Sequence, residues 1–395
     1  MPVSQLTSPL NNPPLCSLQS TYIRNAVLHG LRKSKSEAAK LVSASFVYEY
    51  PTIERMATFL SKAVADPNSA QGVDLATRGR ELQAVVDKHT EGFPSRPAVN
   101  VSAHTSSHGN VYLLSGTTGG LGSNMLAHLL REPAVGRIYA FNRPSKSSSS
   151  EERQFSAFKQ RGLDTSLLSS EKIVYVEGDL SVSGFALDEK LYEEVREVFS
   201  AASRAHTTSI SRSKTQSHTS SIMVRQCLFF WTNLTESIIA WKINLNLSLV
   251  SFDDSIRGVR ALVDFAITSP LARPPHFVFV SSVSVFISAC LLSRRQCFLL
   301  ITYPDFENNG SAAEEMLINP ETSVGTGYSE SKWVAERILD AAAERTALQP
   351  AVVRFGQVCG DGNGTWNETE WFPSLVKSAL ALGCLPSLDG VSWGY

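Results

Sequence analysis

The chain has 395 residues, enough for two or three domains, and its 43% hydrophobic and 18% charged residues are typical of a globular protein. A net charge of −1 argues against a nucleic-acid-binding or acidic-membrane-binding surface. Six scattered cysteines without a C-x-x-C pair indicate neither a metal site nor a disulfide framework, and the first residues lack the basic start and apolar core of a signal peptide. We therefore expect a cytoplasmic protein that binds neither metal, nucleic acid nor membrane.

The N-terminal region predicts a small helical segment followed by a linker. Residues 1–14 are rich in Pro, Asn and Ser, and we expect them to be disordered. Apolar residues then recur at helical spacing, and Thr52 is placed to cap a second helix. This segment, 15–65, is too short to bury a large core. Residues 66–109 are polar and predict a linker that contains one amphipathic helix, near 81–88.

A glycine cluster stands between an apolar run and a helix-like run. Its spacing is G-x-x-G-x-x-G, which predicts a strand, a tight turn and a helix N-terminus that bind the pyrophosphate of a dinucleotide. The alternative is an ordinary glycine-rich turn between two elements. The residues predicted to contact the cofactor here are Gly116, Thr117, Thr118, Gly119, Gly120, Leu121 and Gly122.

The next two strands end in residues that would meet the adenosine half of the cofactor. The strand 137–141 is followed by Asn142 and Arg143, with no acidic residue for the 2′-hydroxyl of NAD, so Arg143 favours NADP. A third strand, 173–176, leads to Asp179 and Leu180. Asp179 either contacts the adenine or caps the next turn.

Two irregular stretches interrupt the alternation of strands and helices, near 200–225 and near 286–305. The fourth strand is expected either at 227–231 or at 237–240. A helix over 256–266 and a fifth strand over 277–280 follow, and the fifth strand ends in Ser281 and Ser282.

Tyr328 and Lys332 form a Y-x-x-x-K pair near the start of a predicted helix. Residues four apart share one helical face. An ammonium group beside a phenol lowers the pKa of the phenol, which makes the tyrosine a usable proton donor or acceptor near neutral pH. The alternative is a chance pair on the surface.

Together these motifs resemble the thioester reductase domain, of the extended short-chain dehydrogenase/reductase type. This domain occurs at the C-terminus of fungal adenylate-forming, carboxylic acid and non-ribosomal-peptide-synthetase-like reductases. The matching pieces include LSGTTGGLGSNML, GYSESKWVAERIL and VVRFGQVCGDGNGTWNETEWFPSLVKSALALGCLPSLDG. The resemblance implies an α/β fold over 110–395, a Rossmann-type doubly wound parallel sheet that binds NADP.

The resemblance also implies a reaction. NADPH gives a hydride to a thioester held on a phosphopantetheine arm, and Tyr328 and a serine hydrogen-bond the developing oxyanion. Tyr328 supplies a proton, Lys332 tunes Tyr328 and binds the nicotinamide ribose, and the hemithioacetal collapses to aldehyde and thiol. We assign the serine to Ser282, with Ser281 and Ser284 as alternatives.

The N-terminal pieces CSLQSTYIRN and FVYEYPTIERMATFL resemble the second half of an acyl or peptidyl carrier domain. By that resemblance Ser17 carries the phosphopantetheine, although Cys16 stands where the family has aspartate. The alternative for Ser17 is an ordinary helix cap.

The chain departs from the family pattern at Ile238 and Ile239, where an Asn-Ala pair is expected, and it stops at Tyr395 short of the family's C-terminal region. We hypothesise a truncated relative whose two irregular stretches are translated non-coding sequence. Three functions remain open: a thioester reductase served by an adenylation or carrier protein, a general reductase of small carbonyls or sugar nucleotides, and a non-catalytic remnant that at most binds NADP(H). The acyl group is not specified.

Overall fold

A computed structural model describes residues 17–42, 46–50, 52–66, 75–97, 109–202, 236–239, 247–270, 274–288, 316–356, 366 and 371–384. The two irregular stretches lie largely outside these ranges, as do Cys16 and the 227–231 alternative for the fourth strand. No helix in the described ranges has both the length and the apolar character that a membrane span requires.

The core of the molecule is a six-stranded sheet in which every neighbouring pair is parallel. The strand order is β3-β2-β1-β4-β5-β6, so the order reverses between β1 and β4, as in a doubly wound Rossmann sheet. The predicted fold is therefore confirmed, and the fourth strand is the 237–240 alternative. The strands are β1 Asn110–Ser115, β2 Val135–Asn142, β3 Ile173–Glu177, β4 Glu236–Ile239, β5 His276–Ser282 and β6 Pro350–Phe355.

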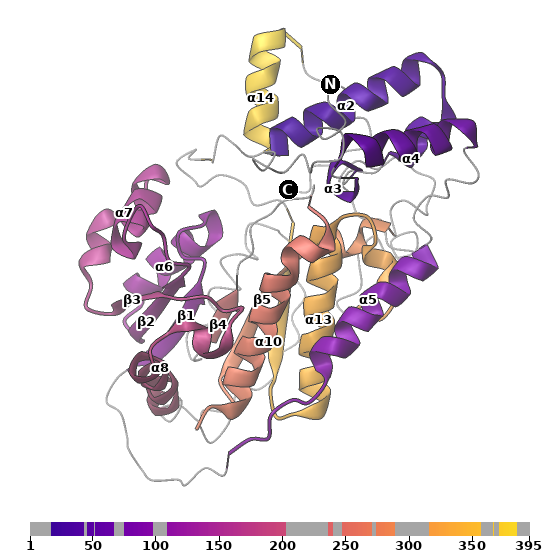
Figure 1. Cartoon of the computed structure of the whole chain (residues 1–395). Helices are drawn as coiled ribbons and strands as arrows, with labels where there is room; N and C mark the ends of the chain where they lie inside the picture. The colour runs from indigo at the N-terminus through magenta and orange to yellow at the C-terminus, as the bar shows by residue number, and fades with distance from the viewer. Residues whose placement is uncertain are drawn as a thin grey trace, which may run out of the picture.

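Helices cover both faces of the sheet (Figure 1). Alternate residues of β1 point to opposite faces: Tyr112 and Leu114 pack with α6, whereas Val111 and Leu113 pack with α10 and α13. A strand buried on both faces reads as a continuous apolar run, which is why 111–114 contains no polar residue. The helices of this domain are α6 Gly120–Arg131, α7 Ser150–Gln160, α8 Glu189–Ala202, α10 Asp253–Thr268, α13 Gly327–Arg345 and α14 Trp371–Leu382.

Helix α5, Leu75–Thr90, packs on α13 rather than standing apart from the sheet domain (Figure 1). Its Leu82 and Val86 share a buried cluster with Trp333 and Ile338 of α13. The sequence predicts 66–109 to be a linker with a shorter helix, yet this part of it belongs to the packed core. The sequence did not predict this packing because few apolar residues of α5 lie on one face. Their partner, α13, is distant in the sequence.

Charged side chains hold both ends of α5. Near its start, Arg78 donates to both carboxylate oxygens of the buried Glu330, at 3.1 and 2.6 Å. At its end, Arg260 of α10 donates to the backbone carbonyls of His89, Glu91 and Gly92 at 2.7 to 2.9 Å. Guanidinium groups at a helix C-terminus complement the negative end of the helix dipole, so these contacts fix α5 against the domain.

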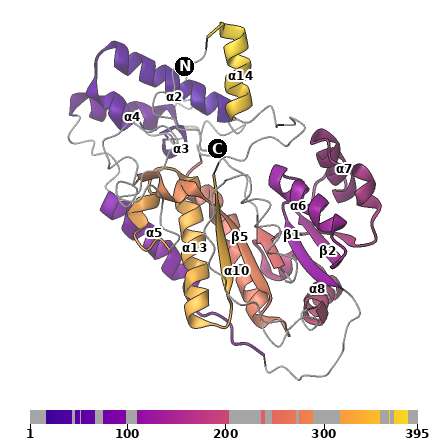
Figure 2. The same cartoon turned by 180° about the vertical axis from the view of Figure 1, so that it is seen from behind.

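The N-terminal segment forms a small helical unit with its own apolar cluster. It contains α2 Ser17–Lys33, the 3₁₀ turn η1 Glu37–Leu41, α3 Phe46–Glu49 and α4 Ile53–Ala65, and Figure 2 shows these helices grouped together. Its buried residues are Leu28, Val42, Phe46, Val47 and Met56. The predicted cap at Thr52 is confirmed, because its side chain accepts a hydrogen bond from the backbone N–H of Arg55 at 3.1 Å.

Candidate active site

The glycine turn joins the carboxyl end of β1 to the start of α6, and two of its glycines are required by geometry. Gly116 has a φ of 70°, which is unfavourable for residues with a side chain. A Cβ on Gly122 would lie 2.2 Å from the carbonyl oxygen of Gly116. The N–H of Gly119 closes the turn by donating to that same carbonyl at 2.9 Å. The helix therefore begins as close to the strand as the backbone allows.

The N-terminus of α6 is open to an anion. Its N-cap is Gly119, which has no side chain to bind the first N–H groups, and the first turn contains no acidic residue. Those N–H groups have no partner within the helix and carry the positive end of its dipole. Gly119 and Gly120 are exposed, with Thr118 and Leu121 half-buried beside them. This cradle fits the pyrophosphate of a dinucleotide.

A buried network of uncharged groups supports the turn from behind. Asn142 donates to the hydroxyl of Thr117 at 2.7 Å, and that hydroxyl donates to Gln154 at 2.6 Å. The backbone carbonyl of Thr117 accepts from Gln154 at 3.0 Å and from Ser123 at 2.8 Å. Thr117 and Asn142, both predicted to contact the cofactor, thus hold the turn in shape. Sequence reasoning missed Gln154, a single polar residue on α7, and Ser123, which lies on the predicted helix but carries no motif of its own.

The expected adenosine end of the site brings Arg143 near Asp179. The carboxylate of Asp179 accepts from the hydroxyl and the backbone N–H of Ser181, at 2.7 and 2.9 Å. These hydrogen bonds, and then the charge of Arg143, hold the pKa of Asp179 below its usual value. Asp179 therefore caps the next turn, one of its two predicted roles. Arg143 is exposed, and Leu180 packs against the core next to Gly258.

Tyr328 and Lys332 lie on the buried face of α13 beside the end of β5. A capping box between Thr326 and Ser329 starts this helix. The exposed fraction is 5% for Tyr328 and 1% for Lys332. The ammonium nitrogen of Lys332 donates to the backbone carbonyl of Val280 at 2.6 Å and lies 5.8 Å from the centre of the Tyr328 ring.

Of the three candidate serines, Ser282 is the one that meets Tyr328. A side-chain hydrogen bond joins Ser282 and Tyr328, and the Ser282 oxygen also accepts from the backbone N–H of Ser284 at 3.1 Å. Ser281 points to the other side and donates to Glu336 at 2.5 Å. The Ser284 hydroxyl is buried and has no hydrogen-bond partner within the described ranges. The geometry therefore favours Ser282 over both alternatives.

The prediction that Tyr328 has a lowered pKa is wrong for this structure. Burial raises the pKa of Tyr328, and the hydrogen bond from Ser282 only partly opposes that effect. Burial also lowers the pKa of Lys332, to about 7. The carboxylate of Glu336 raises this pKa but by less than burial lowers it. The sequence shows that the two residues share a face but does not show that the face is buried. At neutral pH Tyr328 is therefore protonated and Lys332 is close to its midpoint.

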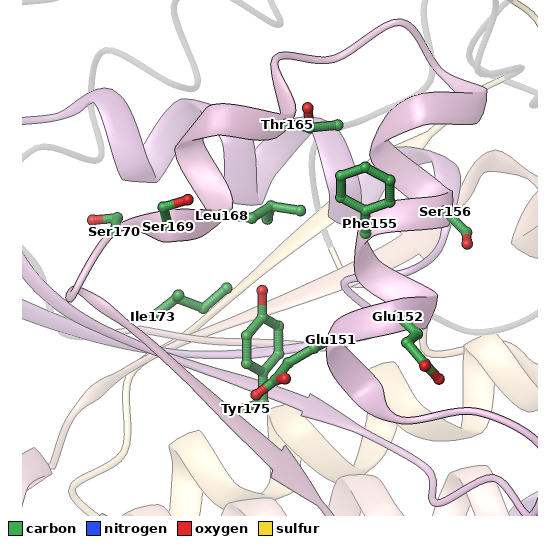
Figure 3. Close-up of a pocket in the computed structure, with 10 residues that line it drawn as sticks. All are labelled: Glu151, Glu152, Phe155, Ser156, Thr165, Leu168, Ser169, Ser170, Ile173 and Tyr175. Atoms are coloured by element: carbon green, nitrogen blue, oxygen red, sulfur yellow. The ribbon is translucent and has the colours of Figure 1, made fainter.

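A pocket lies away from these residues, at the outer edge of the sheet (Figure 3). Its walls come from α7, the 3₁₀ turn η2 Thr165–Ser169 and the edge strand β3. Figure 3 shows the Tyr175 hydroxyl and the Phe155 ring directed into it. None of the predicted site residues lines this pocket, so it is separate from the site at the glycine turn and α13.

A family model matches most of this chain. The model of the male sterility protein family matches residues 114–215 and 248–392, which is more than half of the chain. The chain belongs to this family. The male sterility protein family model describes an NAD-binding domain, so the chain is assigned a nicotinamide cofactor, in agreement with the cradle at α6.

Two curated relatives of this male sterility family member are fungal reductases. The chain is 36% identical over 381 residues to adenylate-forming reductase Nps10 of Heterobasidion annosum, covering 95% of this chain and 30% of that protein. It is 28% identical over 354 residues to a carboxylic acid reductase of Neurospora crassa, covering 89% and 28% respectively. The chain spans less than a third of the length of these two relatives. The predicted resemblance to fungal adenylate-forming reductases is confirmed.

Two solved structures share the fold of this male sterility family member. The terminal R domain of the myxalamid pathway superposes with a TM-score of 0.54 and 22% identity, over 80% of this chain and 64% of that one. A thiolation-reductase di-domain of an archaeal non-ribosomal peptide synthetase gives 0.53 and 16% identity, over 96% and 65%. Identities this low concern the fold alone. The resemblance of residues 15–65 to a carrier domain stays a prediction.

Proposed function

We propose that the chain is an NADPH-dependent reductase that releases a carrier-bound acyl thioester as an aldehyde. The observation that carries the proposal is the buried contact between Ser282 and Tyr328, with Lys332 one turn further along the same helix. The relatives named as adenylate-forming and carboxylic acid reductases support the same chemistry. The substrate is then an acyl thioester, presented by a carrier or adenylation protein.

The residues of the cradle would hold the cofactor, which supplies a hydride when bound. The N-terminus of α6 would bind its pyrophosphate, and exposed Arg143 would accommodate a 2′-phosphate, which gives the preference for NADP. Asp179 and Leu180 border the adenosine end, and the ammonium of Lys332 would bind the nicotinamide ribose.

Tyr328 and Ser282 act on the substrate. Their hydroxyl groups would both donate to the oxygen that becomes negatively charged when the thioester carbonyl is reduced. Because burial keeps Tyr328 protonated at neutral pH, it would then transfer its phenolic proton to that oxygen. The low exposure of Tyr328 and Lys332 excludes bulk water from this step.

The N-terminal segment would present the substrate in the same chain. Helix α2 begins at Ser17, the position at which a phosphopantetheine-bearing serine is expected by resemblance to carrier domains. Incubation with a phosphopantetheinyl transferase and labelled coenzyme A should label the wild type and Ser20→Ala but not Ser17→Ala. Equal labelling of all three, or of none, would contradict this part of the proposal.

The test of the main proposal is in two steps. NADPH binding by the purified chain is measured by cofactor fluorescence against NADH, and aldehyde release is then measured from acyl-pantetheine thioesters. Tighter binding of NADPH together with aldehyde formation is expected. NADPH binding without aldehyde would instead support a non-catalytic remnant. Reduction of free aldehydes or ketones alone would support a general reductase of small carbonyls.

A further inference from the structure

A second buried polar group lies one turn beyond Lys332 on α13. The carboxylate of Glu336 is 1% exposed and accepts hydrogen bonds from Ser281 and Arg354. The hydroxyl of Ser281 donates at 2.5 Å, and Arg354 donates from Nε at 3.0 Å and from a terminal nitrogen at 2.7 Å. The carboxylate thereby joins α13 to both β5 and β6.

Three consecutive residues of β5 each contact one polar residue on the same face of α13. The carbonyl of Val280 accepts from Lys332, Ser281 donates to Glu336, and Ser282 is hydrogen-bonded to Tyr328. Tyr328, Lys332 and Glu336 are spaced by four residues, so they form one stripe along the helix. A rotation or slide of α13 would break all three contacts together. The stripe thus fixes the distance between the proposed proton donor and its serine.

In the described part of the chain, the charged groups near Lys332 include residues of α13 and β6. Glu336 is on its own helix, and Arg354 of β6 lies on the far side of that carboxylate. Two residues of β5 contact Lys332: its ammonium donates to the carbonyl of Val280, and the centre of the Phe279 ring is 4.7 Å from the ammonium nitrogen. Tyr328, the other titratable neighbour on α13, is neutral at pH 7. Among the residues that the structure describes, Glu336 is the carboxylate that favours the charged form of Lys332.

We propose that Glu336 is a positioning residue that holds α13 in register with the end of β5 and stabilises the ammonium form of the buried Lys332. Its catalytic meaning rests on the proposed function, since the ammonium would bind the cofactor ribose. Arg354 and Ser281 orient the carboxylate and satisfy its oxygens, because a buried carboxylate is stable only when its oxygens are paired. The direction of the electrostatic effect agrees: Glu336 raises the pKa of Lys332 against the larger opposite effect of burial.

The charge of Lys332 can be read directly, without cofactor or substrate. The full chain is labelled with ¹³C-lysine, the Lys332 resonance is identified by its loss in Lys332→Met, and its chemical shift is followed with pH. Glu336→Gln should lower the titration midpoint by about one pH unit, because the variant loses the opposite charge that raises the pKa of Lys332. That corresponds to about a tenfold loss of proton affinity.

Glu330 is the matched control. It is a buried carboxylate on the same helix, bound by two nitrogens of Arg78, but it faces α5 instead of β5. Glu330→Gln should destabilise the fold and leave the Lys332 midpoint unchanged. Equal midpoints in the wild type and Glu336→Gln, or equal shifts in the two variants, would overturn the proposal.

A double variant guards against a Glu336→Gln protein that fails to fold. Glu336→Met with Arg354→Met replaces the pair by apolar side chains, an exchange that proteins often tolerate. The Lys332 midpoint should fall here too, since the carboxylate is lost in this variant as well. An unchanged or raised midpoint would contradict the proposal. A wild type that binds no NADPH would contradict the proposed function, while the Lys332 titration would still decide the role of Glu336.

Discussion

The glycine turn and the face of α13 are the two halves of the proposed site, and they are stabilised by different kinds of contact. At the turn, buried hydrogen bonds join neutral groups: a hydroxyl, two amides and backbone carbonyls. Along α13 the buried contacts involve ionisable groups, with Lys332 at a carbonyl and two Arg–Glu pairs. The first half should therefore depend on shape and the second on pH. Uncharged networks keep their form when protons bind, whereas buried charges do not.

The largest expected effect is on the rate of turnover. It distinguishes the role of the α13 face from that of the glycine turn. Tyr328→Phe removes the phenolic proton donor but keeps the ring that packs on Phe252. The rate of aldehyde release should fall about a thousandfold, within the range for loss of a general acid. NADPH binding, measured by fluorescence, should stay within about twofold of the wild type because the cradle is untouched. A variant that retains its rate would show that the proton comes from elsewhere.

The next effect is on the shape of the turn. Gly122→Ala places a methyl group against the Gly116 carbonyl, so the strand–helix junction must open, at a cost of about 3 kcal/mol of unfolding free energy. Gly120→Ala is the control, because its nearest neighbour would be Arg161 at 3.9 Å, an ordinary contact. Urea unfolding should show the loss for the first variant and less than about 0.5 kcal/mol for the second. Equal stabilities would mean that the turn is not constrained as described.

The pH dependence of stability tests the charged half. Lys332 has a pKa of about 7 in the fold and an ordinary value of 10.5, so between these values the unfolded chain binds one more proton. The free energy of unfolding of the wild type should therefore rise with pH across this window, relative to Lys332→Met. The slope of the difference is at most about 1.4 kcal/mol per pH unit. Parallel curves for the two proteins in urea unfolding would show that folding does not lower the pKa of Lys332.

The smallest effect concerns the choice of cofactor. Arg143→Glu replaces an exposed cation by an anion, which should weaken NADPH binding about tenfold through loss of a charged hydrogen bond and leave NADH binding little changed. Lys146→Glu, an equal charge change at another exposed position after β2, should have a weaker effect. Parallel fluorescence titrations with the two cofactors check both variants. An equal loss of affinity for NADPH and NADH would mean that Arg143 does not recognise the 2′-phosphate and only contributes positive charge near the cofactor.

The sequence alone supported the sheet, the glycine turn and the Tyr328–Lys332 pair, since each rests on short spacings that chemistry constrains locally. It did not reveal Gln154, Glu336 or the packing of α5. Those depend on partners far along the chain, such as Arg78 and Glu330, which are 252 residues apart. The prediction of a lowered pKa for Tyr328 was wrong for the same reason. How deeply a helix face is buried depends on the whole fold and not on local spacing.

The docking of α5 also sets how far the N-terminal helices can travel. Eight residues, 67–74, separate the last described residue after α4 from the first residue of α5. A fully extended stretch of that length reaches at most about 30 Å. If α5 were part of a free connection, the tether would run from 67 to 109 and reach several times further. The short connection thus limits the distance between the N-terminal helices, which include Ser17 at the start of α2, and the start of α5.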